Sequence, residues 1–280
     1  MSELVEVASP RARWGASLRE IWQRRDLLLL LLRKDLVASY KQSLLGPLWF
    51  VIQPLVTSLV FGLLFGRFAR LSPPSVPPFL YYLAGYVLWN YFASTLTLVS
   101  GSLIANVSIL RKIYFPRLII PLVAAGVSTV NFVINYLVFL GIYAVYVLGG
   151  WESPLTPRGA LILVPALLIF VGVVGAGIGT WLAAWSVSYR DLRIGMPVVV
   201  NLWMFATPII WPLKLAPPDK RWLFAFNPMA PVVEAHRAAL LGTVFPDPWW
   251  LLIGGVTGLV AVIGGLIVYH RAQPTMVDTL

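Results

Sequence analysis

Charged residues are scarce in this sequence, and cysteine is absent from it. Only 11% of the 280 residues are charged and 59% are hydrophobic, whereas soluble domains carry about 25% charged residues. The mean hydropathy is +0.82. This composition excludes an ordinary soluble domain and indicates a chain that is solvated mostly by lipid. The lack of cysteine excludes disulfide bonds and thiolate metal sites.

Acidic side chains are missing from the long apolar runs, since all eleven lie between or outside those runs. Carriers driven by an ion gradient keep ionisable or ion-coordinating groups at membrane depth, so this absence argues against such a carrier. The dipeptide Gly-Lys does not occur, and the sequence therefore has no G-x-x-x-x-G-K-[ST] phosphate-binding loop. We expect no ATP hydrolysis, no catalytic residues, no bound cofactor and no metal in this chain.

Six apolar stretches are long enough, or nearly so, to cross a bilayer, for which a helix needs about 20 residues. They cover residues 48–66, 79–100, 118–148, 160–185, 196–212 and 249–270. The fifth is short, and Pro208 predicts a kink in it. These stretches predict an all-α polytopic membrane protein with six transmembrane helices in residues 48–271, a cytoplasmic N-terminal segment in 1–47 and a cytoplasmic tail in 272–280.

The distribution of lysine and arginine predicts the orientation. With six spans, 14 of these cations lie on the side that holds both termini and seven lie on the other side. Because cytoplasmic loops carry an excess of positive charge, we expect both termini in the cytoplasm. The net charge of +10 fits loops that face anionic lipid and the cytoplasm better than it fits nucleic-acid binding.

The segment before the first span predicts an amphipathic helix in the cytoplasmic interface. Ser17 to Glu20 reads SLRE, which fits a capping box, and the helix would run to about Tyr40. Its leucines, Leu27 to Leu32, are flanked by Arg24, Arg25, Arg33 and Lys34, as in helices that lie in the headgroup region with their cations toward headgroups. A soluble helix packed on another subunit is the alternative.

The longest outer loop predicts a re-entrant helical hairpin. Asn227 and Pro228 separate two short, partly apolar helices, and such a hairpin enters the membrane only where protein or a watery cavity covers its backbone. Glu234 and Arg237 are three residues apart on the second helix. Two interpretations remain for this pair, a surface ion pair of little energetic value or a polar contact at an exit.

Aromatic residues fall on single faces of three predicted helices, if each residue advances by 100°. The faces contain Phe50, Phe61, Phe65 and Phe68 in the first span, Tyr82, Tyr86 and Trp89 in the second, and Trp203 and Trp211 in the fifth. One interpretation is a conduit whose aromatic faces stack on sugar rings. The other is ordinary packing and interfacial aromatic belts.

Small residues also form faces, which allow helices to approach closely. They comprise Gly172, Gly175 and Gly179 in the fourth span, and Gly254, Gly258, Ala261 and Gly265 in the sixth. Asn131 and Asn135 in the third span are one turn apart. They favour interhelical hydrogen bonds over a substrate site.

Four blocks of sequence, in this order, resemble those of a known family. They are YKQSLLGPLWFVIQPL at 40–55, LRKIYFPRLIIPL at 110–122, SVSYRDLRIGMPVVVNLWMFATPIIWP at 186–212 and FNPMAPVVEAHRAALLG at 226–242. Together they resemble type-2 ABC transporter permeases that export polysaccharide or polyol phosphate. That family includes the Wzm O-antigen exporter permeases and the teichoic-acid exporter permeases.

The resemblance implies a half-transporter in a bacterial inner membrane. Two copies would form one conduit, and two copies of a separate ABC ATPase, which binds ATP and Mg²⁺, would dock below it. The implied substrate is a lipid-linked polysaccharide on undecaprenyl diphosphate. The alternatives are a type-2 permease for a lipid or drug and a membrane-embedded glycosyltransferase or polymerase. The sequence lacks the D-x-D-like acidic pair expected of the last class.

The resemblance also implies roles for two cytoplasmic loops. The loop after the second span would carry a coupling helix that docks on the ATPase, with Ile109, Leu110, Arg111, Lys112, Ile113 and Tyr114. The loop after the fourth span would carry the family's YRD sequence, here Tyr189, Arg190 and Asp191. In the outer hairpin, the resemblance covers Asn227 and Pro228.

The absence of native cysteine makes the topology directly testable, because each introduced cysteine is the only thiol. We expect Asp219→Cys and Asp247→Cys to react with a membrane-impermeant maleimide added outside intact spheroplasts, and Lys112→Cys to react only after permeabilisation. Labelling of Lys112→Cys from outside together with protection of Asp219→Cys would reverse the orientation.

Overall fold

The computed structural model describes residues 14–41, 46, 48–110, 115–151, 159–189 and 191–272, and every regular element in these ranges is helical. The α-helices are α1 (Trp14–Gln23), α2 (Arg25–Tyr40), α3 (Leu48–Phe61), α4 (Pro78–Ala105), α5 (Val107–Leu110), α6 (Ile119–Leu148), α7 (Gly159–Ser188), α8 (Asp191–Phe205), α9 (Met229–Leu241) and α10 (Pro248–Ala272). A π-helix, η1 (Gly62–Phe68), continues α3, and two 3₁₀ helices, η2 (Leu213–Leu215) and η3 (Arg221–Phe226), precede α9.

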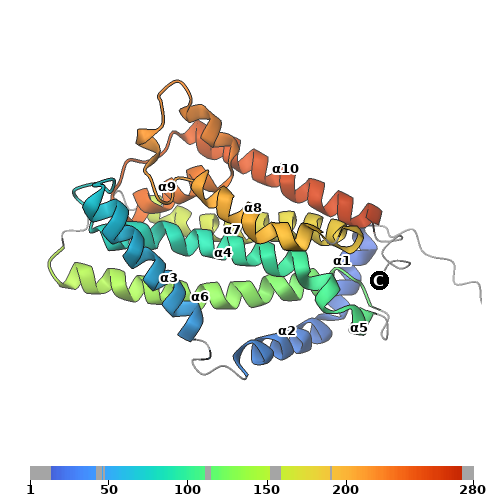
Figure 1. The fold of residues 1–280 in the computed structure, drawn as a ribbon. Coiled ribbons are helices and arrows are strands. Elements are labelled where there is room, and N and C mark those ends of the chain that lie inside the picture. Colours follow the sequence, from blue (N-terminus) through green and yellow to red (C-terminus); the bar gives the residue numbers. More distant parts are fainter. Residues whose placement is uncertain are drawn as a thin grey trace, which may run out of the picture.

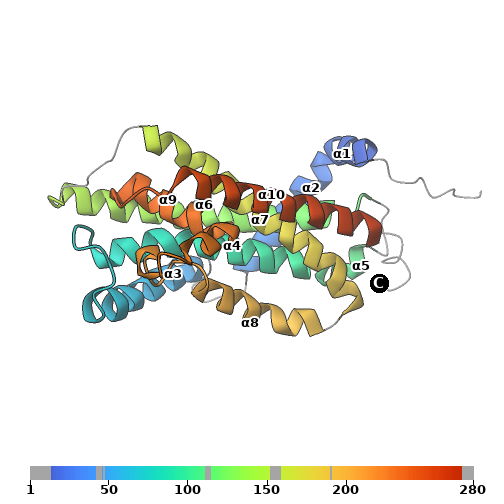
Figure 2. The ribbon, with the colours of Figure 1, turned by 90° about the horizontal axis from the view of Figure 1, so that it is seen from above.

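The long helices lie side by side in one bundle, with α4 at its centre (Figure 1). Helix α4 packs against α3, α6, α7 and α9, and α7 also packs against α10. Two views show α1, α5 and the last turn of α10 at one end of the bundle, and η1 and α9 toward the other (Figures 1 and 2). The first and last described helices therefore reach the same end.

Five helices are long and apolar enough to cross a membrane within the described residues: α3 with η1, α4, α6, α7 and α10. Their positions agree with the first, second, third, fourth and sixth predicted spans. The fifth span was predicted wrongly in extent, because α8 ends at Phe205 and residues 206–212 form turns and irregular backbone. The break thus comes before Pro208, where the sequence predicts only a kink.

The N-terminal segment forms two helices where the sequence predicts one. They are separated at Arg24, and α1 already begins at Trp14, so Ser17 lies inside the helix and the capping-box prediction is wrong. Helix α2 packs against α6, with Leu31 buried and Leu32 close to Gly126. Leu29 and Leu30 stay exposed, as suits a helix that lies beside lipid.

The predicted small-residue faces are sites of close helix approach. Along α7, a methyl group added at Gly172, Gly175 or Gly179 would meet Tyr91, Thr95 or Val99 of α4. Along α10, Gly258 lies against Phe170 and Gly265 against the backbone of Gly177, both in α7. Glycines on two helices therefore let α7 pack tightly between α4 and α10.

Candidate functional site

A cavity of about 380 Å³ lies between α3, α4, α6 and α8, in the part of the bundle built from apolar helices. Its polar lining consists mainly of side-chain amides, from Gln53, Asn90, Asn131, Asn135 and Asn201. Hydroxyl groups of Ser94 and Thr97 and the rings of Phe50, Tyr91 and Phe132 complete the polar and aromatic wall. Of the aromatic residues assigned to a conduit from the sequence, only Phe50 lines this cavity.

The amides of the cavity have unused hydrogen-bonding capacity. Asn135 donates from Nδ2 to the carbonyl of Asn131 at 3.0 Å, whereas the side chains of Gln53, Asn90 and Asn201 make no hydrogen bond to another described residue. Each free amide donates two hydrogen bonds and accepts through two lone pairs. Amide groups with free donors and acceptors hydrogen-bond readily to water or to a polar ligand, so this cavity suits either.

Three polar side chains of the cavity wall reach the surface of the chain. Gln53, Thr97 and Asn201 are exposed, although each belongs to a helix that is predominantly apolar. Polar side chains are unfavourable against hydrocarbon and face bundle interiors or watery cavities in membrane proteins. The mouth of the cavity between α3, α4 and α8 is therefore turned toward water or protein rather than lipid.

Hydroxyl groups hold α4 against α6 beside the cavity. Tyr91 Oη lies 2.9 Å from Thr129 Oγ1, and Ser128 Oγ lies 2.9 Å from Ser94 Oγ and 2.7 Å from Thr95 Oγ1. Interhelical bonds of this kind fix helix pairs in membranes. They fix the two walls that carry Asn90, Asn131 and Asn135.

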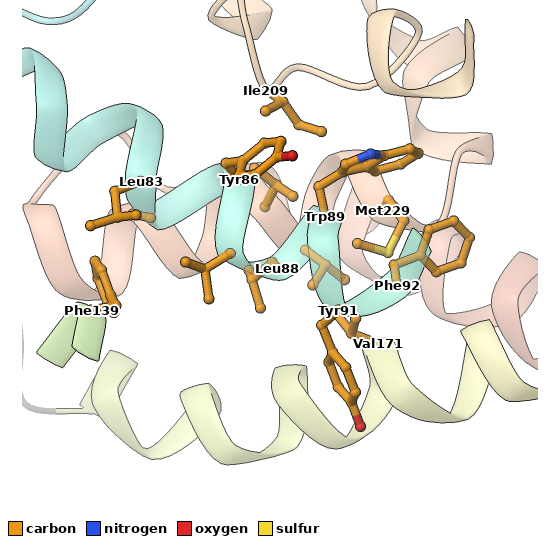
Figure 3. Packing of buried hydrophobic residues seen from close by; sticks show 14 of the residues in the cluster. Leu83, Tyr86, Leu88, Trp89, Tyr91, Phe92, Phe139, Val171, Ile209 and Met229 are labelled. Carbon is orange, nitrogen blue, oxygen red and sulfur yellow. The ribbon is translucent and has the colours of Figure 1, made fainter. Parts of the chain in front are cut away.

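Several aromatic residues of the first and second predicted spans pack against one another inside the chain. Phe61 meets Phe65, Tyr82 and Tyr86 in edge-to-face contacts, with ring centroids 5.8, 6.3 and 6.0 Å apart. Tyr82, Tyr86 and Trp89 are buried. Figure 3 shows Tyr86 and Trp89 on the side of α4 that faces Ile209, with Tyr91 on the other side. Burial favours a packing role for these residues, and a conduit-lining role remains a prediction.

Two predicted aromatic faces do not form as expected. From Gly62 onward the first span is a π-helix, whose i→i+5 turns are wider than those of an α-helix, and Phe68 is 77% exposed at its end. Trp211 lies beyond the end of α8 and packs on Phe224 at 5.2 Å between ring centroids. Trp203 instead packs against Trp89 and Phe92 of α4.

Asn227 joins the end of α8 to the start of α9. Its Oδ1 accepts from Trp203 Nε1 at 3.2 Å and from the Met229 backbone N–H at 3.1 Å. Its Nδ2 donates to Thr207 Oγ1 at 2.9 Å and to the Ala206 carbonyl at 3.2 Å. The amide thus fills its full bonding capacity. Pro228 is the N-cap residue of α9.

Arg237 is fully buried, which excludes the interpretation of Glu234 and Arg237 as a surface ion pair. Its Nη1 donates to the Pro208 carbonyl at 2.7 Å and to Tyr81 Oη at 3.2 Å, and its Nη2 donates to the Ile209 carbonyl at 2.8 Å. Nε donates to the Tyr81 carbonyl at 3.2 Å. The guanidinium therefore satisfies carbonyls of the irregular backbone that follows α8, which is buried at Pro208 and Ile209, and buried carbonyls need such partners.

Glu234 and His236 flank this arginine on α9, which is too short to cross a membrane. Burial raises the pKa of the Glu234 carboxyl, and the neighbouring Arg237 opposes this rise. Burial, reinforced by Arg237, lowers the pKa of His236 to about 3. The imidazole is therefore neutral at cellular pH, and its Nε2 lies 3.1 Å from Tyr136 Oη.

The predicted cytoplasmic loops are described only in part. Ile109 and Leu110 end α5 and pack, half-buried, against a cluster that contains Phe115 and Tyr269. Tyr189 and Asp191 are exposed at the start of α8. The remaining residues of these two predictions lie outside the described residues, namely Arg111, Lys112, Ile113, Tyr114 and Arg190.

The amide cavity was not found from the sequence. The sequence favours helix packing for Asn131 and Asn135 and gives no role to Gln53, Asn90 and Asn201. A search for amide side chains inside apolar spans, which are costly there, would have found all five. The five amides come together only because four helices pack against one another. The pattern of residues along any one helix does not show this.

Comparison with known proteins finds relatives along most of the chain. The sequence profile of the ABC-2 type transporter family matches residues 26–241. The O-antigen export system permease protein RfbA of Klebsiella pneumoniae is 27% identical over 255 residues, which cover 91% of this chain and 95% of that protein. RfbA of Myxococcus xanthus is 28% identical, with 82% and 85% covered. The polysialic acid transport protein KpsM of Escherichia coli is 22% identical, with 88% and 93% covered.

Two glycines of α4 provide a matched test of the arginine contacts. A methyl group at Gly85 would collide with the Arg237 guanidinium, whereas nothing lies within 4 Å of one at Gly101. Alanine favours a helix over glycine by roughly 0.5–1 kcal/mol, so Gly101→Ala should leave thermal stability unchanged or raised. Gly85→Ala should lower the unfolding temperature of the purified protein by several degrees. Equal stability of the two variants would show that the guanidinium is not held against Gly85.

Proposed function

Because the chain belongs to the ABC-2 type transporter family, we propose that it is the membrane permease subunit of an ATP-driven polysaccharide exporter. The relatives described above are permeases and transport proteins, and their names refer to O-antigen and polysialic acid. The chain is accordingly a multi-pass membrane transport subunit rather than an enzyme. The chemistry of its cavity supports a hydroxyl-rich cargo.

The amide cavity is the observation that carries this proposal. A sugar presents several hydroxyl groups, each of which donates one hydrogen bond and accepts others, and amides match this pattern because they do both. Gln53, Asn90 and Asn201 keep this capacity free of other described residues. The ring of Phe50 on the same wall offers an apolar face to the C–H groups of a pyranose. The acyl chains of a lipid or an apolar drug would leave these amides without partners.

A second copy of the chain would complete the conduit. One cavity of about 380 Å³ has room for a short piece of a glycan but does not enclose a passage. Its mouth carries the exposed side chains of Gln53, Thr97 and Asn201. Pairing two such mouths would shield these polar groups from lipid and form a continuous polar path. The cost of leaving this face in hydrocarbon supports the proposed homodimer.

The energy would come from two copies of a separate ATPase subunit, which binds ATP and Mg²⁺. Members of this family work with such a partner. The docking surface we propose lies at the end of the bundle that holds α5 and the start of α8, around Ile109, Leu110, Tyr189 and Asp191. The same end carries Arg19, Arg24 and Arg25, which are exposed. These cations suit the diphosphate of an undecaprenyl-linked glycan arriving from the cytoplasmic leaflet.

Replacing cavity amides should reduce export without unfolding the protein. We expect Asn90→Leu and Asn201→Leu each to lower the rate of ATP-dependent glycan transport in proteoliposomes about 2- to 10-fold, since a hydrogen bond contributes roughly 0.5–1.5 kcal/mol. Thr257→Val is the control, because Thr257 bonds to its own helix in α10 and does not line the cavity. Normal transport by both asparagine variants would exclude the cavity from the glycan path.

The isolated chain should show no ATPase activity, and activity should appear with the nucleotide-binding subunit. Charge reversal by Arg111→Glu with Lys112→Glu should abolish co-purification of the two subunits or separate hydrolysis from export, because these cations would fix the docking helix. Lys220→Glu, an exposed change in the loop between η2 and η3, is the matched control. Pull-down and hydrolysis assays measure both effects. Glycan export by the wild-type chain without any ATPase would refute the proposed energy source.

A further inference from the structure

A second cavity, of about 410 Å³, lies at the end of the bundle that holds α9 and the start of α10. Its walls come from Tyr81 at the start of α4, Lys214 in η2, Glu234 in α9, Thr243 and Asp247 in the connection to α10, and Trp250 in α10. A volume of about 300–1,000 Å³ is usual for small-ligand pockets. None of these residues lines the amide cavity.

Two buried oxygen atoms in residues of this wall are without hydrogen-bond partners among the described residues. They are Glu234 Oε1 and Thr243 Oγ1. Glu234 Oε1 lies 3.6 Å from Arg237 Nη1, but that nitrogen already donates to Pro208 and Tyr81. A buried acceptor of this kind costs about 1–3 kcal/mol unless something donates to it. Both atoms thus have capacity for a ligand with hydroxyl or N–H groups.

The lining of the cavity carries side chains of both charge signs, and Arg237 lies behind Glu234. Lys214 and Arg221 oppose Glu234 and Asp247 on its lining. Arg221 is already engaged, because its Nε and Nη2 donate to the carbonyls of Ala216 and Lys214. A simple cation or anion would therefore meet like charge as well as opposite charge. This mixture of charges favours an uncharged ligand that donates several hydrogen bonds.

Trp250 gives the cavity an aromatic wall. It is half-buried, whereas its neighbour Trp249 is 69% exposed and does not line the cavity. An indole face is electron-rich and attracts the C–H groups on one face of a sugar ring. A site that binds a monosaccharide typically offers acceptors for its hydroxyl groups, a hydrogen-bond donor and an aromatic face. This cavity has all three.

We propose that this cavity binds one sugar unit of a glycan at the outer end of the permease, with Glu234 and Thr243 accepting from hydroxyl groups and Trp250 against the ring. The proposal rests on the proposed function for the identity of the glycan. The cavity would bind a part of the glycan that has already crossed the membrane. Binding there would oppose its return between cycles of ATP hydrolysis.

The test uses the full chain with its ATPase partner, purified in detergent, in an Asn90→Leu and Asn201→Leu background that weakens the amide cavity. The probe is an oligosaccharide released by mild acid from the polysaccharide that the host exports, and its binding is measured by ligand-observed NMR titration. Trp250→Leu and Thr243→Val should each weaken binding at least about fivefold. Trp250→Phe should restore most of the affinity, and Trp249→Leu should bind like the parent.

Equal affinity of Trp250→Leu, Thr243→Val and Trp249→Leu, or no binding by the parent, would overturn the inference. A zwitterionic phospholipid that co-purifies with the parent and is lost from Glu234→Gln and Lys214→Ala would also overturn it, since the cavity would then be a headgroup site. ATP-dependent export by the wild-type pair in proteoliposomes is scored separately. Its failure would reject the proposed function, whereas a negative titration alone would reject only this site. The unfolding temperature of each variant is measured as well, so that a variant that fails to fold is recognised.

Discussion

The structure depends on how Arg237 satisfies the backbone that follows α8. Helix α8 stops at Phe205, and the next carbonyls would have no partners in an apolar surrounding. The guanidinium donates to two of them, at Pro208 and Ile209, and to Tyr81 of the central helix. Hydrogen bonds that involve a charged group contribute about 1.5–3 kcal/mol each, which offsets the cost of burying the cation. Gly85 is part of this arrangement because only a residue without a side chain leaves room for it.

The same contacts determine where the polar cavity lies. Arg237 and Asn227 together fix the end of α8 to α4 and α9, and α8 then presents Asn201 beside Gln53 of α3 and Asn90 of α4. Helix α6 is held to α4 by hydroxyl groups and supplies Asn131 and Asn135. An arginine at one end of the bundle is thereby linked to amides farther along it. Of the two cavities, one is lined by α8 and the other by α9.

The sequence predicts the long helices and their tight contacts well, because apolar length and small-residue spacing are local properties. The regions of Leu48–Phe68, Pro78–Ala105 and Pro248–Ala272 agree with predicted spans, and Gly175 and Gly258 lie at helix contacts. Prediction from the sequence fails where contacts between segments far apart in the chain determine the local structure. The early end of α8 depends on an arginine more than 30 residues away, the π-helix at η1 changes the register of Phe68, and the burial of Arg237 depends on three other segments. The amides converge only through packing, so one helical period does not reveal their cavity.

The central claim is that glycan crosses beside the amides between α3, α4, α6 and α8. The most direct measurement is a cryo-EM structure of the permease with its ATPase, trapped during transport of lipid-linked glycan by a hydrolysis-deficient ATPase. The account predicts two copies of the chain and glycan density within hydrogen-bond distance of Asn90 and Asn201. Glycan density on another face of the bundle, with these amides occupied only by lipid or by packed side chains, would contradict it.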